Sequence, residues 1–381
     1  MEKKSKSPLI IKGGNVDMPF MILVLTLLAI GLIMLFSASH ASAFYRQGNS
    51  YAFIFQQLIV AAVGVVVMVL ISFFNYRKLH HLALLGYVGS VGLLALTHFM
   101  PSIQGARRWI VIAGHQFQPS EIAKACLVVF LAHIMCKYFD RMGEFKIGIL
   151  LMGSVFAVMA LPLVTQPHLS ATILLFSMTA AMMFVGGVKI NHIMAIVVLG
   201  LIVATLAYLF VPGVEKLFAH AERRLQYWID PFKDAQGAGY QSVQSLYAIG
   251  SGGILGVGLG ESRQKYMYLP EVQNDFVFAV VCEEFGFMGA TFIIILFALL
   301  VWRGFAIAMK ARDKFGALIV VGLITQVGVQ AFLNIAVVTN TVPNTGISLP
   351  FFSYGGTALL VMLAQMGLIL SVSRQINYEK E

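Results

Sequence analysis

Four carboxylates lie in and just before one strongly apolar stretch in the second half of the chain. Glu271 precedes the stretch, Asp275 opens it, and Glu283 and Glu284 lie inside it. An ionised carboxylate surrounded by hydrocarbon costs about 2.5–3.5 kcal/mol even on the most lenient insertion scale. We therefore expect these side chains to face a polar cavity or a buried partner.

Asp275 has two interpretations that its spacing alone leaves open. Asp and Asn are preferred N-cap residues at the head of a helix, whereas a carboxylate at a membrane surface also suits catalysis or ion coupling. The two roles are compatible in part, because Asn274 could cap the helix while Asp275 points into a cavity. Glu283 and Glu284 lie about 12 Å deeper in a continuous helix, on different faces, and we predict buried structural roles for both.

A second group of polar residues opens another apolar stretch. Pro119 suits the first position of a helix, with Gln118 just before it. Glu121 and Lys124 are then three residues apart on one face, within reach of an ion pair. A structural ion pair and a pair of substrate contacts both remain open for them, and Arg108 is equally suited to anchor the membrane interface or to bind phosphate.

The composition is that of a polytopic membrane protein. Hydrophobic residues make up 59% of the chain and charged residues 11%, and the mean hydropathy is +0.84. We predict one all-α membrane domain over residues 1–381 with ten spans, each about 18 or more apolar residues long. The predicted spans are residues 18–39, 53–74, 80–99, 119–137, 147–164, 169–187, 191–211, 275–301, 314–338 and 354–373.

An even number of spans places both termini on one side, and the basic residues indicate which side. More than half of the Lys and Arg residues fall in the short segments that are cytoplasmic if the N-terminus is cytoplasmic. We therefore expect cytoplasmic tails at 1–17 and 374–381. This topology and attraction to anionic membrane lipids account for the net charge of +9, so that no nucleic-acid partner is needed.

Two long segments on the opposite, extracytoplasmic side are expected to carry function. The first is the loop at 212–274, which begins with a predicted interfacial helix and contains, at 241–260, a predicted short helix that runs into a glycine-rich turn region. Its glycines lack dinucleotide-binding spacing and are better explained by tight turns and close backbone approach. The second is the loop at 340–356, whose Pro and Gly residues exclude a regular helix, so we expect it to line a cavity.

These residues predict an outward-facing polar cavity with a carboxylate at the membrane surface and basic groups beside it. Such a cavity suits a lipid-linked anionic substrate whose head group lies at the interface. It equally suits a proton-coupled transporter, and the residues alone do not separate the two.

Several of these segments resemble the SEDS family of shape, elongation, division and sporulation proteins, which includes FtsW, RodA and SpoVE. The resembling segments are Ser37-Ala-Ser39, Gly105–Ile110, Gln118–Lys124, Asp230-Pro231, Tyr240–Gly260, Gln264-Lys265, Leu269–Gly286 and Pro343–Gly356. They follow one another in the same order across nearly the whole chain, and residues 258–271 look like the division and sporulation branch. Two positions depart from the family pattern: His168 replaces a common Asp, and Gln56 replaces a common basic residue.

The resemblance implies a peptidoglycan glycosyltransferase that polymerises lipid II at the outer face of the bacterial cytoplasmic membrane. Asp275 matches the position of the family's essential aspartate, and we expect it to act as general base in an inverting displacement. The resemblance also implies the nascent glycan as acceptor, a class B penicillin-binding protein as partner, and other divisome proteins nearby.

The pyrophosphate leaving group requires positive charge. Arg108, Lys124, Lys265 or a divalent cation, Mg²⁺ or Mn²⁺, are the candidates to supply it. The other expected substrate contacts are Gln118, Glu121, Ser245, Glu271, Asn344, Thr345 and Ser353.

Two other functions compete with this one. A lipid II flippase would use Glu121, Lys124 and Glu284 for coupling or for binding the head group, but the inverted repeats common in transporters are not evident. A non-enzymatic scaffold for division proteins would leave the carboxylate cluster unexplained.

Overall fold

In the computed structural model, the structure describes residues 14–101, 107–112, 115–166, 169–195, 227–237 and 239–377, with the single residues 198, 205 and 225. His168, most of the predicted span at 191–211 and most of the predicted interfacial helix after residue 212 lie outside these residues.

Within the described residues, eight helical segments are long and apolar enough to cross a membrane, as expected for a multi-pass all-α protein. They are α1 (Met18–Gln47), α2 (Ala52–Phe73), α3 (Leu79–Leu96) with its flanking 3₁₀ turns η1 (Tyr76–Lys78) and η2 (Thr97–Phe99), α4 (Pro119–Lys137), η4 with α5 (Lys146–Leu151, Met152–Thr165), α10 (Val277–Lys310), α11 (Lys314–Val338) and α12 (Gly356–Asn377). A shorter apolar helix, α6 (Leu169–Val185), packs among them.

The remaining described elements are short. They are the 3₁₀ turns η3 (Phe139–Arg141) and η5 (Pro231–Asp234), the helix α9 (Tyr240–Gly252), and the antiparallel strands β1 (Ile110–Ile112) and β2 (His115–Phe117). The hairpin of β1 and β2 was not predicted from the sequence.

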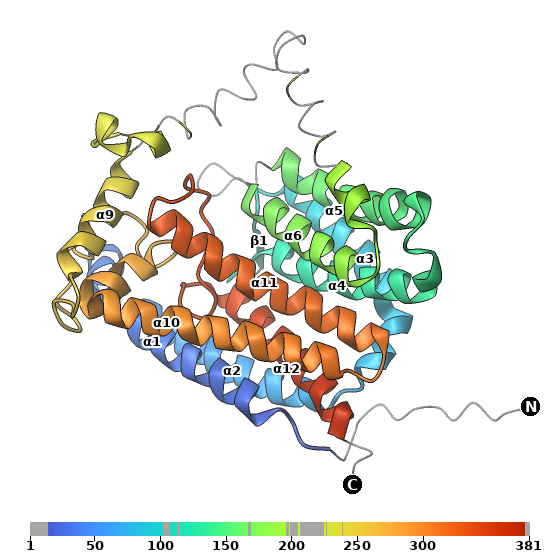
Figure 1. Cartoon of the computed structure of the whole chain (residues 1–381). Helices are drawn as coiled ribbons and strands as arrows, with labels where there is room; N and C mark the ends of the chain where they lie inside the picture. Colours follow the sequence, from blue (N-terminus) through green and yellow to red (C-terminus); the bar gives the residue numbers. More distant parts are fainter. Residues whose placement is uncertain are drawn as a thin grey trace, which may run out of the picture.

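The helices form one bundle in which α11 lies between two groups (Figure 1). α1, α2, α10 and α12 pack together on one side of it, and α3, α4, α5 and α6 on the other. The predicted bounds of α4 and α11 match the structure, whereas α1 and α10 extend by about two turns beyond their predicted ends.

Both described ends of the chain lie at the same end of the bundle, as the even number of spans predicts. The carboxylate of Asp17 accepts hydrogen bonds from Phe20 at the start of α1 and from the Arg303 guanidinium of α10. The backbone N–H of Asp17 donates to the Ser373 hydroxyl in α12 at 3.1 Å. We call this the termini end, and the opposite end, which carries the hairpin and α9, the site end (Figure 1).

α10 is broken at Gly286, where the sequence predicts a continuous helix. Gly286 has φ 63° and ψ −164°, and the segment 253–258 that follows α9 fills the gap with its backbone. The bonds run from Val257 N–H to Glu283 O, from Gly258 N–H to Glu284 O, from Phe287 N–H to Gly253 O and from Met288 N–H to Ile254 O, at 2.9–3.1 Å. Backbone groups freed by the break are therefore satisfied by another part of the chain.

Glycine is required on both sides of this junction. A Cβ on Gly286 would lie 2.3 Å from the Gly256 backbone nitrogen, and a Cβ on Gly256 would lie 2.2 Å from the Glu284 carbonyl oxygen. Both glycines also have positive φ, which side chains disfavour. The interpretation of the glycine-rich stretch as a site of close backbone approach is confirmed.

The loop between α11 and α12 packs deep inside the bundle. A Cβ on Gly31, near the middle of α1, would lie 2.4 Å from the Phe351 carbonyl oxygen. Phe351 and Phe352 are buried. The loop is covered by protein at this depth, and its residues Ser348, Leu349 and Pro350 line a small cavity, as predicted from the sequence.

Candidate active site

Asp275 lies two residues before the start of α10, and its side chain is half-buried. The N-cap position of α10 is occupied by Phe276, and within the described chain this helix start has no side-chain capping bond. The amide of Asn274 instead donates to the Glu271 carboxylate at 2.8 Å. The capping interpretation of Asn274 and Asp275 is therefore wrong, which leaves the Asp275 carboxylate available for another role.

Glu271 links the segment before α10 to α1. Its carboxylate pairs with Arg46 at 2.8 Å and also accepts from the Gln273 amide at 3.2 Å. Glu271 has a positive φ of 50°, so the chain turns sharply at this residue. Its side chain is thus partly occupied in holding the turn that leads to Asp275.

Two further contacts hold the backbone of the segment 271–275. The Gln273 carbonyl accepts from the backbone N–H of Tyr354 at 2.8 Å, and the Asp275 carbonyl accepts from the Asn334 amide at 2.7 Å. Tyr354 belongs to the loop before α12 and Asn334 to α11. Asp275 is consequently positioned by residues that are distant in sequence.

The tip of the α11–α12 loop lies beside Asp275. A Cβ on Gly346 would lie 3.3 Å from Asp275 Oδ2. Asn344 donates from its amide to Gln241 in α9 at 3.0 Å, and the Thr345 carbonyl accepts from the Ser170 hydroxyl at the start of α6. The expected substrate contacts Asn344 and Thr345 thus lie two residues and one residue before Gly346, which approaches Asp275.

The pKa of Asp275 is raised to about 6: burial is the largest cause, the neighbouring Glu271 carboxylate adds to the rise, and Arg108 opposes it. Arg108 therefore lies in the electrostatic environment of Asp275, as expected for a group that faces the same anionic substrate. It precedes the hairpin, which is fastened to α12 by a bond of 3.1 Å from the Thr357 hydroxyl to the Gln116 carbonyl.

Glu121 and Lys124 form a buried ion pair at 2.8 Å, with side-chain exposures of 11% and 2%. Gln118 precedes them, and its carbonyl accepts from the Glu121 backbone N–H at 3.2 Å. Glu121 also lines a cavity of about 20 Å³, together with Gln330 and Ser353. That volume has room for about one water molecule.

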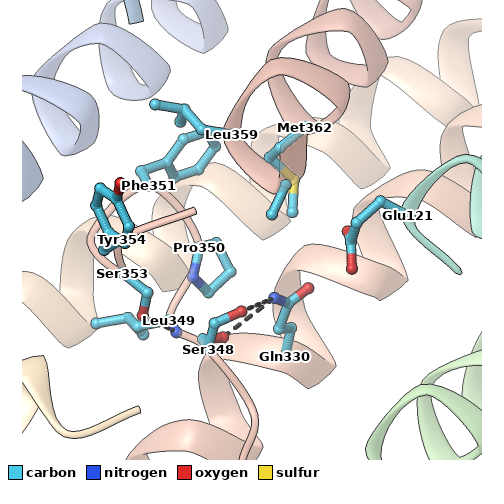
Figure 2. Close-up of a pocket in the computed structure, with 11 residues that line it drawn as sticks. Glu121, Gln330, Ser348, Leu349, Pro350, Phe351, Ser353, Tyr354, Leu359 and Met362 are labelled. Carbon is cyan, nitrogen blue, oxygen red and sulfur yellow. Dashed lines mark hydrogen bonds between the residues drawn. The ribbon is translucent and has the colours of Figure 1, made fainter. Parts of the chain in front are cut away.

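Figure 2 shows how the residues around this cavity lie. Glu121 of α4 lies at the right of the view. Gln330 of α11 donates to Ser348 in the lower part of the view. The Ser353 hydroxyl accepts from the Leu349 backbone N–H at 2.7 Å. The structural interpretation of the Glu121–Lys124 pair agrees with this burial, although Glu121 also reaches the cavity.

Lys265 and Ser245 occupy structural positions instead of facing Asp275. Lys265 is fully buried, and its ammonium pairs with Glu284 at 3.0 Å and donates to the Ser37 hydroxyl at 3.2 Å. The buried Ser245 hydroxyl donates to the Val338 carbonyl at 2.7 Å and fastens α9 to α11. We therefore no longer assign either residue to substrate binding, because their polar atoms are occupied and screened from water.

The predicted structural roles of Glu283 and Glu284 are confirmed. Glu283 accepts from the Ser262 hydroxyl and from the Arg263 backbone N–H, and Glu284 accepts from Ser37 in addition to Lys265. Both glutamates are buried. Together they hold the loop after the glycine-rich segment against the top of α10.

Sequence reasoning missed Asn334 and Gln330. These two amide residues lie four positions apart on α11, so they share one helical face. Both are buried, and Gln326, one turn earlier on the same helix, is buried as well. That spacing inside a predicted span was a usable signal of a polar site.

Comparison with known proteins settles the family. The FtsW, RodA and SpoVE family model, described as a cell cycle protein, matches residues 18–378. The chain belongs to this family.

Relatives within the FtsW, RodA and SpoVE family extend over nearly the whole chain. Stage V sporulation protein E of Bacillus subtilis is 38% identical over 372 residues, which cover 96% of this chain and 99% of the relative. A probable peptidoglycan glycosyltransferase FtsW of Geobacter sulfurreducens is 35% identical over 365 residues, 95% of this chain and 96% of the relative.

Solved structures of the family share the fold. A chain from a study of the structural coordination of polymerization and crosslinking by a peptidoglycan synthase complex matches with a TM-score of 0.78 at 28% identity, covering 95% of this chain and 98% of that chain. Thermus thermophilus RodA matches with a TM-score of 0.69 at 28% identity, covering 96% and 98%.

Proposed function

We propose that this chain is a peptidoglycan glycosyltransferase that polymerises lipid II into β-1,4 glycan strands, in cell division or sporulation. The observation that carries the proposal is the half-buried carboxylate of Asp275, which lies just before the start of a membrane helix. Arg108 interacts with this carboxylate electrostatically. The FtsW relative named above as a probable peptidoglycan glycosyltransferase supports the same reaction. The site end would then face the outside of the cytoplasmic membrane.

In this proposal Asp275 is the general base. Its carboxylate takes the proton from the 4-hydroxyl of the acceptor sugar as that oxygen attacks the anomeric carbon of the donor. The bond from that carbon to pyrophosphate breaks with inversion, so an α-linked donor gives a β-linked product. A carboxylate with a pKa of about 6 is suited to accept a proton near neutral pH, and such a base contributes about 10²–10⁴ in rate.

Pyrophosphate leaves without needing a proton, so the site must supply positive charge. We assign this role first to Arg108, which already interacts with Asp275, because a guanidinium binds phosphate oxygens in a bidentate manner. Glu121, Gln118, Ser353, Asn344 and Thr345 remain proposed contacts to the disaccharide or the head group, and Lys124 acts through its ion pair with Glu121.

A divalent cation, Mg²⁺ or Mn²⁺, would also supply positive charge. No group of three or more His, Cys, Asp or Glu side chains in the described residues could hold a metal ion. Magnesium commonly binds through one or two carboxylates together with substrate phosphates. A cation bound to the pyrophosphate and to the Glu271 carboxylate would have this combination of one carboxylate and phosphate oxygens as ligands. It would neutralise charge on the leaving group.

The partner we propose is a class B penicillin-binding protein, which crosslinks the strands. The match to a chain of a peptidoglycan synthase complex supports this partner. Lipid II, the nascent glycan, membrane lipids and divisome proteins complete the proposed surroundings.

The test is polymerisation of purified lipid II by this protein in detergent, with its transpeptidase added or omitted. Long glycan strands from the wild type, and none from folded Asp275→Ala, would support the transferase. A wild type that makes no polymer with its partner, yet moves labelled lipid II across vesicles, would contradict the proposal and favour the flippase.

A further inference from the structure

Asn334 joins the Asp275 segment to the loop between α11 and α12. Its amide nitrogen donates to the Asp275 carbonyl at 2.7 Å and to the Ile347 carbonyl at 2.6 Å. Both amide hydrogens are therefore used, one on each segment. The residue is 1% exposed and lies in a membrane helix, where an amide is costly unless it is hydrogen-bonded.

We propose that Asn334 is a positioning residue for the reaction, which fixes the backbone of Asp275 so that its carboxylate faces the acceptor hydroxyl. This inference rests on the proposed function, because it takes Asp275 as the base. Asn334 touches no reacting atom in this scheme, and it acts through the peptide carbonyl that it holds.

The surroundings of Asp275 make its position sensitive to a small backbone shift. Gly346 packs closely beside Asp275 Oδ2, since a Cβ there would lie at 3.3 Å, tighter than an ordinary van der Waals contact. A misplacement of about 1 Å in a catalytic group can cost about 10²-fold in rate. A clamp on the Asp275 carbonyl therefore controls the geometry of the reacting group directly.

Gln330 provides a matched comparison on the same helix face. Its amide donates to both the carbonyl and the hydroxyl of Ser348 at 3.1 Å. It therefore holds the α11–α12 loop one residue beyond Ile347, while its described hydrogen bonds do not involve Asp275. Any effect that is common to both variants comes from loosening the loop, and any effect confined to Asn334 comes from Asp275.

The pH dependence of the rate distinguishes positioning from a general loss of structure. The charged groups that act on Asp275 are Glu271 on its own segment and Arg108 before the hairpin, and Arg46 of α1 pairs with Glu271. Burial dominates the raised pKa of Asp275. Releasing its backbone would expose the half-buried carboxylate further to water, so its pKa would fall toward the ordinary range.

The experiment compares the uncharged variants Asn334→Ser, Asn334→Ala and Gln330→Ala in lipid II polymerisation over a series of pH values, with thermal unfolding as the check on folding. We expect folded Asn334 variants to lose about 10²-fold in rate. The fall in their rate at low pH, the acid limb of the pH–rate profile, should be displaced to lower pH. Gln330→Ala should keep the wild-type acid limb, whatever its effect on the rate.

Folded Asn334 variants with the wild-type rate and acid limb would overturn the inference, as would equal displacement of the limb by Gln330→Ala. Failure of every Asn334 variant to fold, including Asn334→Ser, would show a structural role and would also overturn it. Asp275→Asn is assayed in parallel: full activity of that variant refutes the proposed function itself, whereas an inactive Asp275→Asn beside unaffected Asn334 variants refutes only the inference.

Discussion

Lys265 and Glu284 form a fully buried ion pair, with 3.0 Å between Nζ and Oε1 and no exposed side-chain surface on either partner. The pair lies at the break in α10, where Ser37 of α1 donates to the same carboxylate oxygen at 2.6 Å. It therefore joins α1, the loop after α9 and the top of α10 at one point.

Replacing one partner of this pair should destabilise the protein strongly. Lys265→Met leaves a buried carboxylate without its cation, and such a loss costs about 3–5 kcal/mol. The double variant Lys265→Met, Glu284→Gln should recover much of that stability. Thermal unfolding in detergent measures both. A Lys265→Met protein of wild-type stability with weakened lipid II binding would instead restore Lys265 as a substrate contact.

Gly286→Ala should be among the most damaging single substitutions. Its Cβ would collide with the Gly256 nitrogen, and its φ of 63° is unfavourable for alanine, which together cost about 2–6 kcal/mol. Gly89→Ala in α3 is the control, since a Cβ there meets no atom within 4 Å. We expect Gly89→Ala to stay within about 1 kcal/mol of the wild type in thermal unfolding; equal losses for the two variants would disprove the argument from backbone approach.

The acid limb of polymerisation should follow the pKa of Asp275. A base must be ionised, so we expect the rate to fall as the pH drops below about 6. Arg108→Gln removes a positive charge that lowers this pKa and should move the limb to higher pH. Glu271→Gln removes a negative charge that raises it and should move the limb to lower pH. Each shift should be on the order of one pH unit, and shifts in the same direction would refute the electrostatic assignment.

The same carboxylate should reduce stability when it ionises. Its folded pKa of about 6 exceeds the ordinary 3.8, so the folded protein binds this proton more tightly than the unfolded chain. The resulting stabilisation is fully present below about pH 3.8 and is lost as the pH rises through about 6. Asp275→Asn should therefore have a higher Tm than the wild type above pH 6, and this advantage should shrink as the pH is lowered. A constant Tm difference at all pH values would contradict the raised pKa.

The sequence predicted the membrane helices because long apolar runs depend on local composition alone. α4 and α11 end where their hydropathy patterns end. Asp275, Glu271 and Arg108 were identified from residue type and position, and the structure brings them into one electrostatic environment.

The features that sequence reasoning missed depend on contacts between distant segments. The break in α10 requires the backbone of residues 253–258, about thirty residues earlier, and a lone glycine in an apolar run gives no sign of it. The burial of Lys265 depends on Glu284 and Ser37, which no local pattern connects. In the sequence, Asn334 is a polar residue in a largely apolar stretch. Only the structure shows that it donates to the carbonyls of Asp275 and Ile347.

The backbone exchange at Gly286 also restricts how the length of this chain can change in evolution. Each N–H and carbonyl of residues 253–258 that bonds to α10 must stay in register with its partner. Removing or adding one residue there would take at least two of the four bonds out of register with the others. Insertions and deletions accepted during divergence should therefore fall outside this junction, for example in the segment 227–239 before α9.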